Sequence, residues 1–386
     1  MRRLPAALLA TLLLLAACGC GPASRAGTPP PLPAGNRVAG PASGALSPPG
    51  PLRLSVQTVA QGLEAPWAID LATDGSIWVT ERPGRVRVIR NGRLLPAPAL
   101  VLSVVSRPGC ETGLLGLALR GGYAYVDYTH AGAQGNTDRV SRFTVQGDRL
   151  TGEKVILDGI PGGTCYHLGG RLKFGPDGLL YVTTGDGYVA SRAASRGGLS
   201  GKILRMRPDG SGLEMFAWGF RNPEGIAFDA AGRLYASNNG PSGDLGVCCH
   251  DEVDLVRQGA FYGWPAWAGG TRTSYPQDGM PPRTPPLAES GRDTWAPSGV
   301  TVYSPRAGEQ PTLLMTEMRG QALRRFVVDA ADPALVRSQE IVLGGQGRLR
   351  DVVATPDGCL DLLTTNRDGR GTPRAGDDRL LRLCPS

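Results

Sequence analysis

The amino-acid sequence predicts an all-β fold, and within that class a six-bladed β-propeller. Its 386 residues include 56 glycines and 33 prolines, only 19% are charged, and long helical periodicities are absent. A turn-and-strand phrase also recurs along the chain at intervals of roughly 45–80 residues, which leaves room for about four strands in each copy. A pair of β-sandwiches is the alternative architecture, but it would not explain the recurring phrase.

The recurring phrase consists of a small turn that contains glycine, a short apolar strand and a polar segment. Pro176-Asp177-Gly178 forms such a turn, and the strand from Leu179 to Thr184 is rich in β-branched and aromatic residues. The six copies begin at Thr73, Arg120, Gly175, Ala230, Gln310 and Thr355. In a propeller, the loops that leave the innermost strands converge at one end, so residues that are far apart in sequence can meet in one pocket.

The N-terminal segment predicts export and attachment to a membrane. Residues 1–17 have the pattern of a lipoprotein signal peptide, because Arg2 and Arg3 precede an apolar run that is too short to span a bilayer. The run ends in a segment that resembles the bacterial lipobox, in which Cys18 is acylated; an ordinary secretory cleavage nearby is the alternative. We expect residues 18–51, rich in Pro and Gly, to be a disordered tether, and residues 52–386 to be the propeller. The protein is thus expected outside the cytoplasm, held to the membrane only by the lipid on Cys18.

The charge balance excludes an extended nucleic-acid interface. The formal net charge of +7 falls to about +5 once two arginines leave with the signal peptide. The arginines do not occur in runs, and no alternation of basic and aromatic residues suggests nucleic-acid binding.

Six cysteines lie beyond the lipobox region, and an even number outside the cytoplasm predicts disulfides. Cys359 and Cys384 flank strands of one final sheet and are the first expected pair; Cys110 with Cys165 is a second candidate pair. The adjacent residues Cys248 and Cys249 require either a vicinal bridge or other partners. With His250 and Asp251 they also suggest a metal cluster, but no second ligand pair at zinc spacing follows.

Arginines cluster near the recurring phrase. Arg221 and Asn222 precede the fourth copy, Arg319 lies within the fifth, and Arg348 and Arg350 precede the sixth. Residues two apart on an extended strand project to the same face. Converging guanidinium groups need an anion between them, and their planar donors suit carboxylates or phosphates. The sequence therefore predicts a multiply charged anionic ligand; the alternative is that each arginine is solvated or pairs with a nearby acid such as Asp351.

Two further features suggest chemistry at the same pocket. His167, one of three histidines, precedes two glycines that allow close approach of a ligand, and it is suited to accept a proton near neutral pH. A structural histidine is the alternative. The turn at Gly240 and Pro241 offers backbone carbonyls, which calcium accepts as ligands.

The motifs resemble those of the soluble quinoprotein sugar dehydrogenases, the glucose/sorbosone dehydrogenase family, over most of the chain from about Val56 to Leu383. The motifs that carry the resemblance include GLEAPWAI, VTERPGRVRVI, HLGGRLKFGPDGLLYVTTGD, WGFRNPEGIAFD, NNGPSGD and GRLRDV. The resemblance implies a six-bladed propeller that binds pyrroloquinoline quinone and calcium and oxidises aldose sugars to lactones at the anomeric carbon.

The resemblance also implies a role for each candidate residue. His167 corresponds to the base that removes the hydroxyl proton while hydride passes to the quinone, and Asp186 to an acidic residue near that base. Arg221 corresponds to the arginine beside the quinone carbonyl. Gly240 and Pro241 correspond to backbone calcium ligands. The remaining cofactor-site residues would be Glu111, Asn222, Arg319, Arg348 and Arg350.

Several departures from the glucose dehydrogenase branch leave the preferred sugar open. Arg319 stands where that branch has lysine, and Tyr166 replaces the acidic residue before the base. The resemblance is closer to the broader aldose dehydrogenases, with a membrane quinone or a cytochrome as electron acceptor and a homodimer left open. A calcium-dependent lactonase and a sugar-binding propeller without turnover are the alternative functions.

Overall fold

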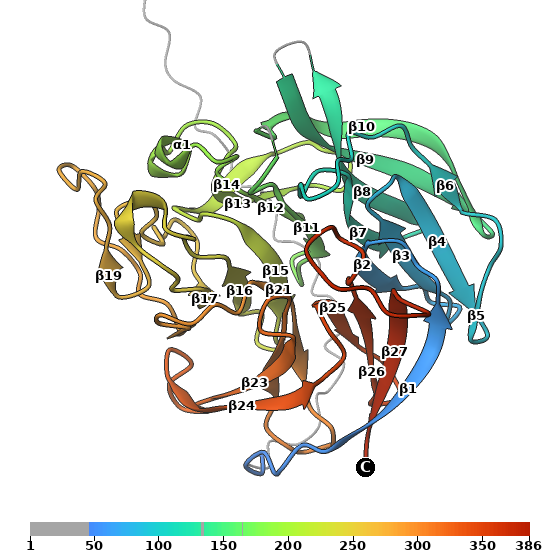
Figure 1. Cartoon of the computed structure of the whole chain (residues 1–386). Helices are drawn as coiled ribbons and strands as arrows, with labels where there is room; N and C mark the ends of the chain where they lie inside the picture. Colours follow the sequence, from blue (N-terminus) through green and yellow to red (C-terminus); the bar gives the residue numbers. More distant parts are fainter. Residues whose placement is uncertain (1–45, 133–134, 164) are drawn as a thin grey trace, which may run out of the picture. The chain divides into compact units, whose positions relative to one another are not determined.

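The described part of the chain forms six antiparallel sheets arranged around a central axis (Figure 1). This computed structural model describes residues 46–132, 135–163 and 165–386. The predicted six-bladed β-propeller is confirmed. The predicted signal peptide and all but the last six residues of the predicted tether lie outside the described residues. Among the described residues, no helix has the length and apolar character needed to cross a membrane.

Each blade is a meander that runs outward from the axis. The first contains β2 (Pro66–Leu71), β3 (Ile77–Glu81), β4 (Arg85–Arg90) and β5 (Arg93–Leu94), with β6 (Leu100–Val101) also paired to β4. The second contains β7 (Leu114–Arg120), β8 (Tyr123–Gly132), β9 (Gly135–Gln146) and β10 (Arg149–Pro161). The third contains β11 (Gly169–Phe174), β12 (Leu180–Thr184), β13 (Lys202–Met206) and β14 (Glu214–Trp218).

The remaining blades repeat this order. The fourth contains β15 (Pro223–Phe228), β16 (Leu234–Asn238), β17 (Glu252–Val256) and β20 (Ala288–Glu289), and the fifth contains β21 (Pro297–Tyr303), β22 (Thr312–Glu317), β23 (Ala322–Val328) and β24 (Val336–Gly344). The sixth contains β25 (Leu349–Ala354), β26 (Leu360–Thr364) and β27 (Arg379–Pro385), and its outermost strand is β1 (Leu54–Gln61). The loops carry a small sheet of β18 (Trp267–Ala268) and β19 (Thr271–Arg272), the short helix α1 (Ala190–Ala194) and the 3-10 turn η1 (Asp244–Gly246).

The hydrophobic core is divided among the spaces between neighbouring blades. Six clusters of buried apolar side chains are present among the described residues, and each joins two consecutive blades. The cluster between the first and second blades, for example, packs Trp67 and Trp78 against Leu117 and Phe143. Alternation along each strand supplies both faces of a blade with apolar side chains, so every sheet is covered on both sides. This packing fixes the six innermost strands as a rigid ring.

All six described cysteines beyond the tether are paired. Cys359–Cys384 and Cys110–Cys165 are confirmed, and Cys248 is joined to Cys249 in a vicinal disulfide. Because this bridge consumes both adjacent thiols, neither is a thiolate ligand for zinc.

Candidate active site

A polar cavity of about 1030 Å³ lies at one end of the propeller axis. Two sets of loops form it: those that lead into the innermost strands and those that leave the second strands. Antiparallel pairing brings these two kinds of chain segment to the same end of each blade. The sequence predicted such a convergence for the loops that leave the innermost strands, which lie at the other end. The lining includes Glu111, Tyr166, His167, Tyr188, Arg221, Asn222, Glu224, Gly240, Pro241, Asp244, Asp251, Arg319, Arg348, Arg370 and Arg374.

His167 is buried and held by hydrogen bonds at both its backbone and its ring. It has a φ of +61° and lies before β11, and its carbonyl passes so close to Gly185 that a Cβ there would approach it to 1.9 Å. His167 Nδ1–H donates to Asp186 Oδ1 at 2.7 Å, and Trp264 Nε1–H donates to the other oxygen of Asp186 at 2.8 Å. A carboxylate only accepts hydrogen bonds, so the proton sits on Nδ1 and leaves Nε2 free to take one.

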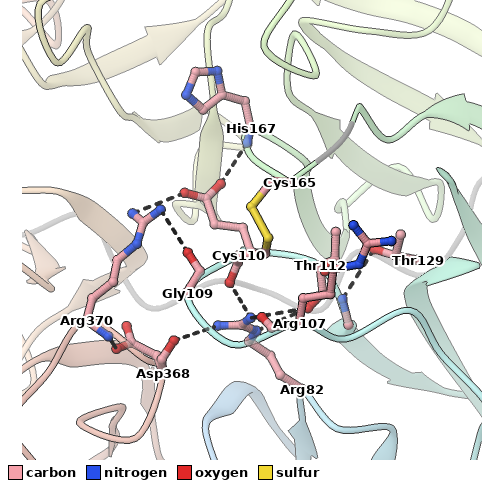
Figure 2. Close-up of a disulfide and its surroundings, with 12 residues drawn as sticks. Arg82, Arg107, Gly109, Cys110, Thr112, Thr129, Cys165, His167, Asp368 and Arg370 are labelled. Atoms are coloured by element: carbon pink, nitrogen blue, oxygen red, sulfur yellow. Dashed lines mark hydrogen bonds and ion pairs between the residues drawn. A yellow bond between two sulfur atoms is a disulfide. The ribbon is translucent and has the colours of Figure 1, made fainter. Parts of the chain in front are cut away.

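Glu111 connects three blades at the edge of the cavity. Its Oε2 accepts a hydrogen bond from the backbone N–H of His167 at 2.7 Å, and its Oε1 lies 3.5 Å from Arg370 Nη1. The Cys110–Cys165 disulfide, drawn in Figure 2, joins the residue before Glu111 to the residue two positions before His167. The disulfide therefore fixes the segment before β7 against the segment that carries the histidine.

Arg221 lies before β15 and is 4% exposed. Its Nε and Nη2 donate to the two oxygens of Asp244 at 2.9 and 3.1 Å. Burial raises the pKa of Asp244, but the charge and hydrogen bonds of Arg221 outweigh it, so the net pKa is below the ordinary value. The pair thus stays ionised, and Arg221 presents a fixed positive charge to the cavity.

Asn222, next along the chain, organises the floor of the cavity. Its Oδ1 accepts the backbone N–H of Gly169 at 2.9 Å, and its Nδ2 donates to Glu224 Oε1 at 2.9 Å. Asn222 therefore ties the start of β15 to the start of β11, directly behind His167.

The arginines of the cavity fall into paired and unpaired groups. Arg348 Nε donates to Asp368 Oδ2 at 2.8 Å, and burial lowers the pKa of Arg348. Arg319 is exposed, and the guanidinium of Arg374 donates only to the Gly345 carbonyl, at 3.5 Å; neither side chain has an ion-pair partner within residues 46–132, 135–163 and 165–386. Arg319 and Arg374 therefore bring two guanidinium groups without acidic partners among the described residues to the cavity lining, where an anionic ligand would balance their charge.

Arg350 does not line the cavity, although the sequence suggested that it faces the same way as Arg348. Arg348 precedes β25, and a register shift between Leu349 and Asp351 breaks the simple alternation of the strand. Arg350 Nη1 donates to Glu224 Oε2 at 2.5 Å, below the cavity floor. Burial raises the pKa of Glu224 despite this partner. Arg171 Nη1 also donates to Asp351 Oδ2 at 2.6 Å. The two ion pairs, Arg350–Glu224 and Arg171–Asp351, fill the channel beneath the cavity.

The turn after β16 brings Gly240 and Pro241 to the cavity wall. Gly240 N–H donates to Asp251 Oδ1 at 2.8 Å, and Asp251 Oδ2 accepts the N–H groups of Trp295 and Ala296. Burial raises the pKa of Asp251. Neither the Gly240 nor the Pro241 carbonyl accepts a hydrogen bond from the described residues. These two oxygens suit calcium, but no group of three or more acidic, histidine or cysteine residues in the described chain could hold a metal alone.

Several residues of the cavity were not predicted from the sequence. Asp244 and Tyr188 lie two to four residues beyond predicted site residues, in the same converging loops. Arg370 and Arg374 follow the sixth copy of the recurring phrase, where the earlier copies carry Asp186 and Gly240. Comparing the loop that follows the phrase across all six copies would have identified Arg370 and Arg374.

The fold and the cavity define a propeller protein with an arginine-rich cavity beside a buried histidine–carboxylate pair. Residues 63–382 match the family described as Glucose / Sorbosone dehydrogenase, and the chain belongs to this family of sugar dehydrogenases.

Known relatives agree with this assignment. An oxidoreductase of Thermus thermophilus has a similar structure, with 40% identity, a TM-score of 0.76, and coverage of 86% of this chain and 99% of that one. The PQQ-bound aldose sugar dehydrogenase of Streptomyces coelicolor is 31% identical, with a TM-score of 0.73 and coverage of 87% and 99%. The aldose sugar dehydrogenase YliI of Escherichia coli is 25% identical, with coverage of 83% and 92%.

Proposed function

We propose that this protein oxidises aldose sugars at the anomeric carbon to lactones, using pyrroloquinoline quinone and calcium. The observation that carries the proposal is the buried pair of His167 and Asp186 in a cavity whose described lining includes two arginines without an acidic partner, Arg319 and Arg374. A proton acceptor of fixed orientation beside a site for a multiply charged planar anion is what such a reaction needs. The PQQ-bound structure of the related Streptomyces coelicolor enzyme supports the choice of cofactor.

In this proposal, separate residues of the cavity accept the proton, stabilise developing charge and bind the cofactor. His167 Nε2 takes the proton of the anomeric hydroxyl, and Asp186 keeps the ring oriented and stabilises the imidazolium that forms. When bound, pyrroloquinoline quinone would supply the acceptor for the hydride that leaves the same carbon. Arg221 places a positive charge where negative charge develops. Arg319, Arg348 and Arg374 would hold the carboxylates of the cofactor.

Calcium would take the carbonyl oxygens of Gly240 and Pro241, with the cofactor and solvent providing the rest of its oxygen ligands. Because the protein offers so few donors by itself, we expect calcium affinity to depend on the presence of the quinone. Removing calcium with a chelator should then release both together.

The N-terminal prediction places this activity outside the cytoplasm, on a membrane to which the lipid on Cys18 anchors the chain. Electrons would pass from the reduced cofactor to a quinone or a cytochrome, and a homodimer is compatible with this arrangement. Labelling with a radioactive fatty acid, compared between the wild type and Cys18→Ser, tests the anchor directly.

His167→Ala tests the proposed chemistry. We expect dye reduction by the cofactor- and calcium-loaded protein to fall by roughly 10²–10⁴-fold, because the proton acceptor is lost, while quinone affinity measured by absorption stays near the wild-type value. His130→Ala is the matched control, since His130 lies on β8 and does not line the cavity. Equal turnover in His167→Ala and the wild type would refute the assignment of the base.

A further inference from the structure

One wall of the cavity consists of aromatic side chains that the mechanism above does not use. Tyr188 follows Asp186 by two residues, and its ring centroid lies 5.0 Å from that of His167. The ring of Tyr166, which precedes His167, lies 6.0 Å from the ring of Tyr188. The guanidinium of Arg370 lies 5.0 Å from the Tyr166 ring. Two aromatic rings thus extend from the histidine to the arginine at the edge of the cavity.

The backbone of Tyr188 has a conformation that large side chains rarely adopt. Its φ is +61°, in the left-handed region that favours glycine. Burial does not compensate for this, because 59% of the residue is exposed. A bulky residue kept in such a conformation at a site is a reason to look for a role of its side chain.

The position of Tyr188 is tied to that of the histidine. Asp186 Oδ1 accepts the backbone N–H of Tyr188 at 2.8 Å as well as Nδ1–H of His167. The carbonyl of His167 accepts the N–H of Gly187 at 3.0 Å. One carboxylate oxygen therefore ties the backbone that carries the exposed phenol ring to the imidazole that accepts the proton.

We propose that Tyr188, with Tyr166 beside it, is the platform against which the sugar ring packs while His167 takes its proton. A pyranose has C–H groups on its faces and hydroxyl groups around its edge. Packing a C–H face on an aromatic ring removes apolar surface of both from water and leaves the hydroxyls for the polar lining. The inference rests on the proposed function and adds the determinant of substrate choice: aldoses with a pyranose ring are preferred over short aldoses without one.

The decisive variant is Tyr188→Gly, because glycine accepts the positive φ and adds no strain. We expect the KM for aldopyranoses to rise about tenfold and kcat to stay within about threefold of the wild-type value. The KM for glyceraldehyde, whose hydrate presents a C1 hydroxyl and hydrogen but no ring face, should not change. Tyr188→Phe keeps the ring and should behave as the wild type does. Val189→Ala, an exposed neighbour that does not line the cavity, is the matched control.

A binding measurement gives a second readout that does not require turnover. Calorimetry with a 1-deoxy aldopyranose, which lacks the hydroxyl that is oxidised, should show an affinity about tenfold weaker for Tyr188→Gly than for the wild type. The affinity for pyrroloquinoline quinone should be equal in the two proteins.

The outcomes separate the platform from the proposed function. An unchanged pyranose KM in Tyr188→Gly overturns the platform but leaves the function intact, because the wild type still oxidises the sugar. A change confined to the KM of the electron acceptor, or to quinone affinity, also overturns it and assigns the ring to that partner. A wild-type protein that oxidises no aldose refutes the proposed function instead, and weaker binding of the 1-deoxy sugar by Tyr188→Gly then supports the platform independently.

Discussion

At the scale of single residues, the hydrogen bonds of Asp186 determine which nitrogen of His167 accepts a proton. Asp186→Asn replaces one accepting oxygen with an amide that donates, so the side chain can no longer accept from both His167 and Trp264. If the remaining oxygen of the asparagine accepts from His167, its amide N–H faces the indole N–H of Trp264. If it accepts from Trp264, its amide N–H faces the Nδ1–H of His167. We expect kcat to fall by roughly 10²–10⁴-fold with quinone affinity retained, because the tautomer and orientation of the histidine are lost.

Asp177→Asn is the matched control, because this aspartate lies in the turn before β12 and does not line the cavity. Steady-state dye reduction and a quinone titration on both variants make the comparison. A wild-type kcat for Asp186→Asn with the cofactor bound would show that proton transfer does not need this partner.

Single residues also show what the sequence can and cannot reveal. His167, Arg221 and Asn222 could be found because each lies at a fixed offset from a strand of the recurring phrase. Asp244 could not be found in this way, since its pairing with Arg221 depends on a turn whose path is set by tertiary contacts. The mutual arrangement of Tyr188 and His167 likewise required coordinates, because it follows from a shared carboxylate oxygen rather than from spacing.

At the scale of elements, the turn after β16 depends on close packing against the segment before β17. A Cβ on Gly240 would lie 1.9 Å from the carbonyl oxygen of Cys249 and 2.6 Å from that of His250. Gly240→Ala must therefore displace the turn that carries the proposed calcium ligands. We expect calcium affinity of the quinone-loaded protein to fall by at least about tenfold, since metal binding depends on ligand position.

Gly344→Ala on β24 is the matched control, because nothing lies within 4 Å of a Cβ there. Calcium titration of both variants, followed through the absorption of the bound quinone, makes the test. Equal calcium affinity in Gly240→Ala and the wild type would remove this turn from the metal site.

Elements also explain why Arg350 was placed incorrectly from the pattern alone. Each of the six innermost strands changes register against its neighbour near the cavity end. The period-two rule assumes an unbroken strand, so it fails where such a shift occurs. The strands themselves were predictable from their apolar residues and turns, whereas the shifts left no comparable signal in composition.

At the scale of the whole molecule, the blade count followed from the repeats, but the way in which the ring closes did not. The sixth blade takes its outermost strand, β1, from the beginning of the described chain, where it pairs with β27 from Leu54–Pro385 to Gln61–Arg379. No copy of the recurring phrase precedes β1. This strand belongs to the sixth blade, and the copy of the phrase in that blade begins some 300 residues further along the chain. Within the same blade, the Cys359–Cys384 disulfide links the residue before β26 to β27, and β1 is held only by hydrogen bonds and packing.

This closure predicts different consequences for two shortened chains. A chain that begins at Leu46 retains β1, and we expect its melting temperature to stay within a few degrees of that of the full chain. A chain that begins at Gly62 lacks β1 and leaves β27 as a free edge, which exposes the apolar side chains that contact Ala60 and offers a strand for aggregation. We expect it to melt at a clearly lower temperature and to associate in light scattering. If the two chains melt alike, the propeller does not depend on β1 for closure, and the five blades with the disulfide-linked remainder of the sixth suffice to hold the ring.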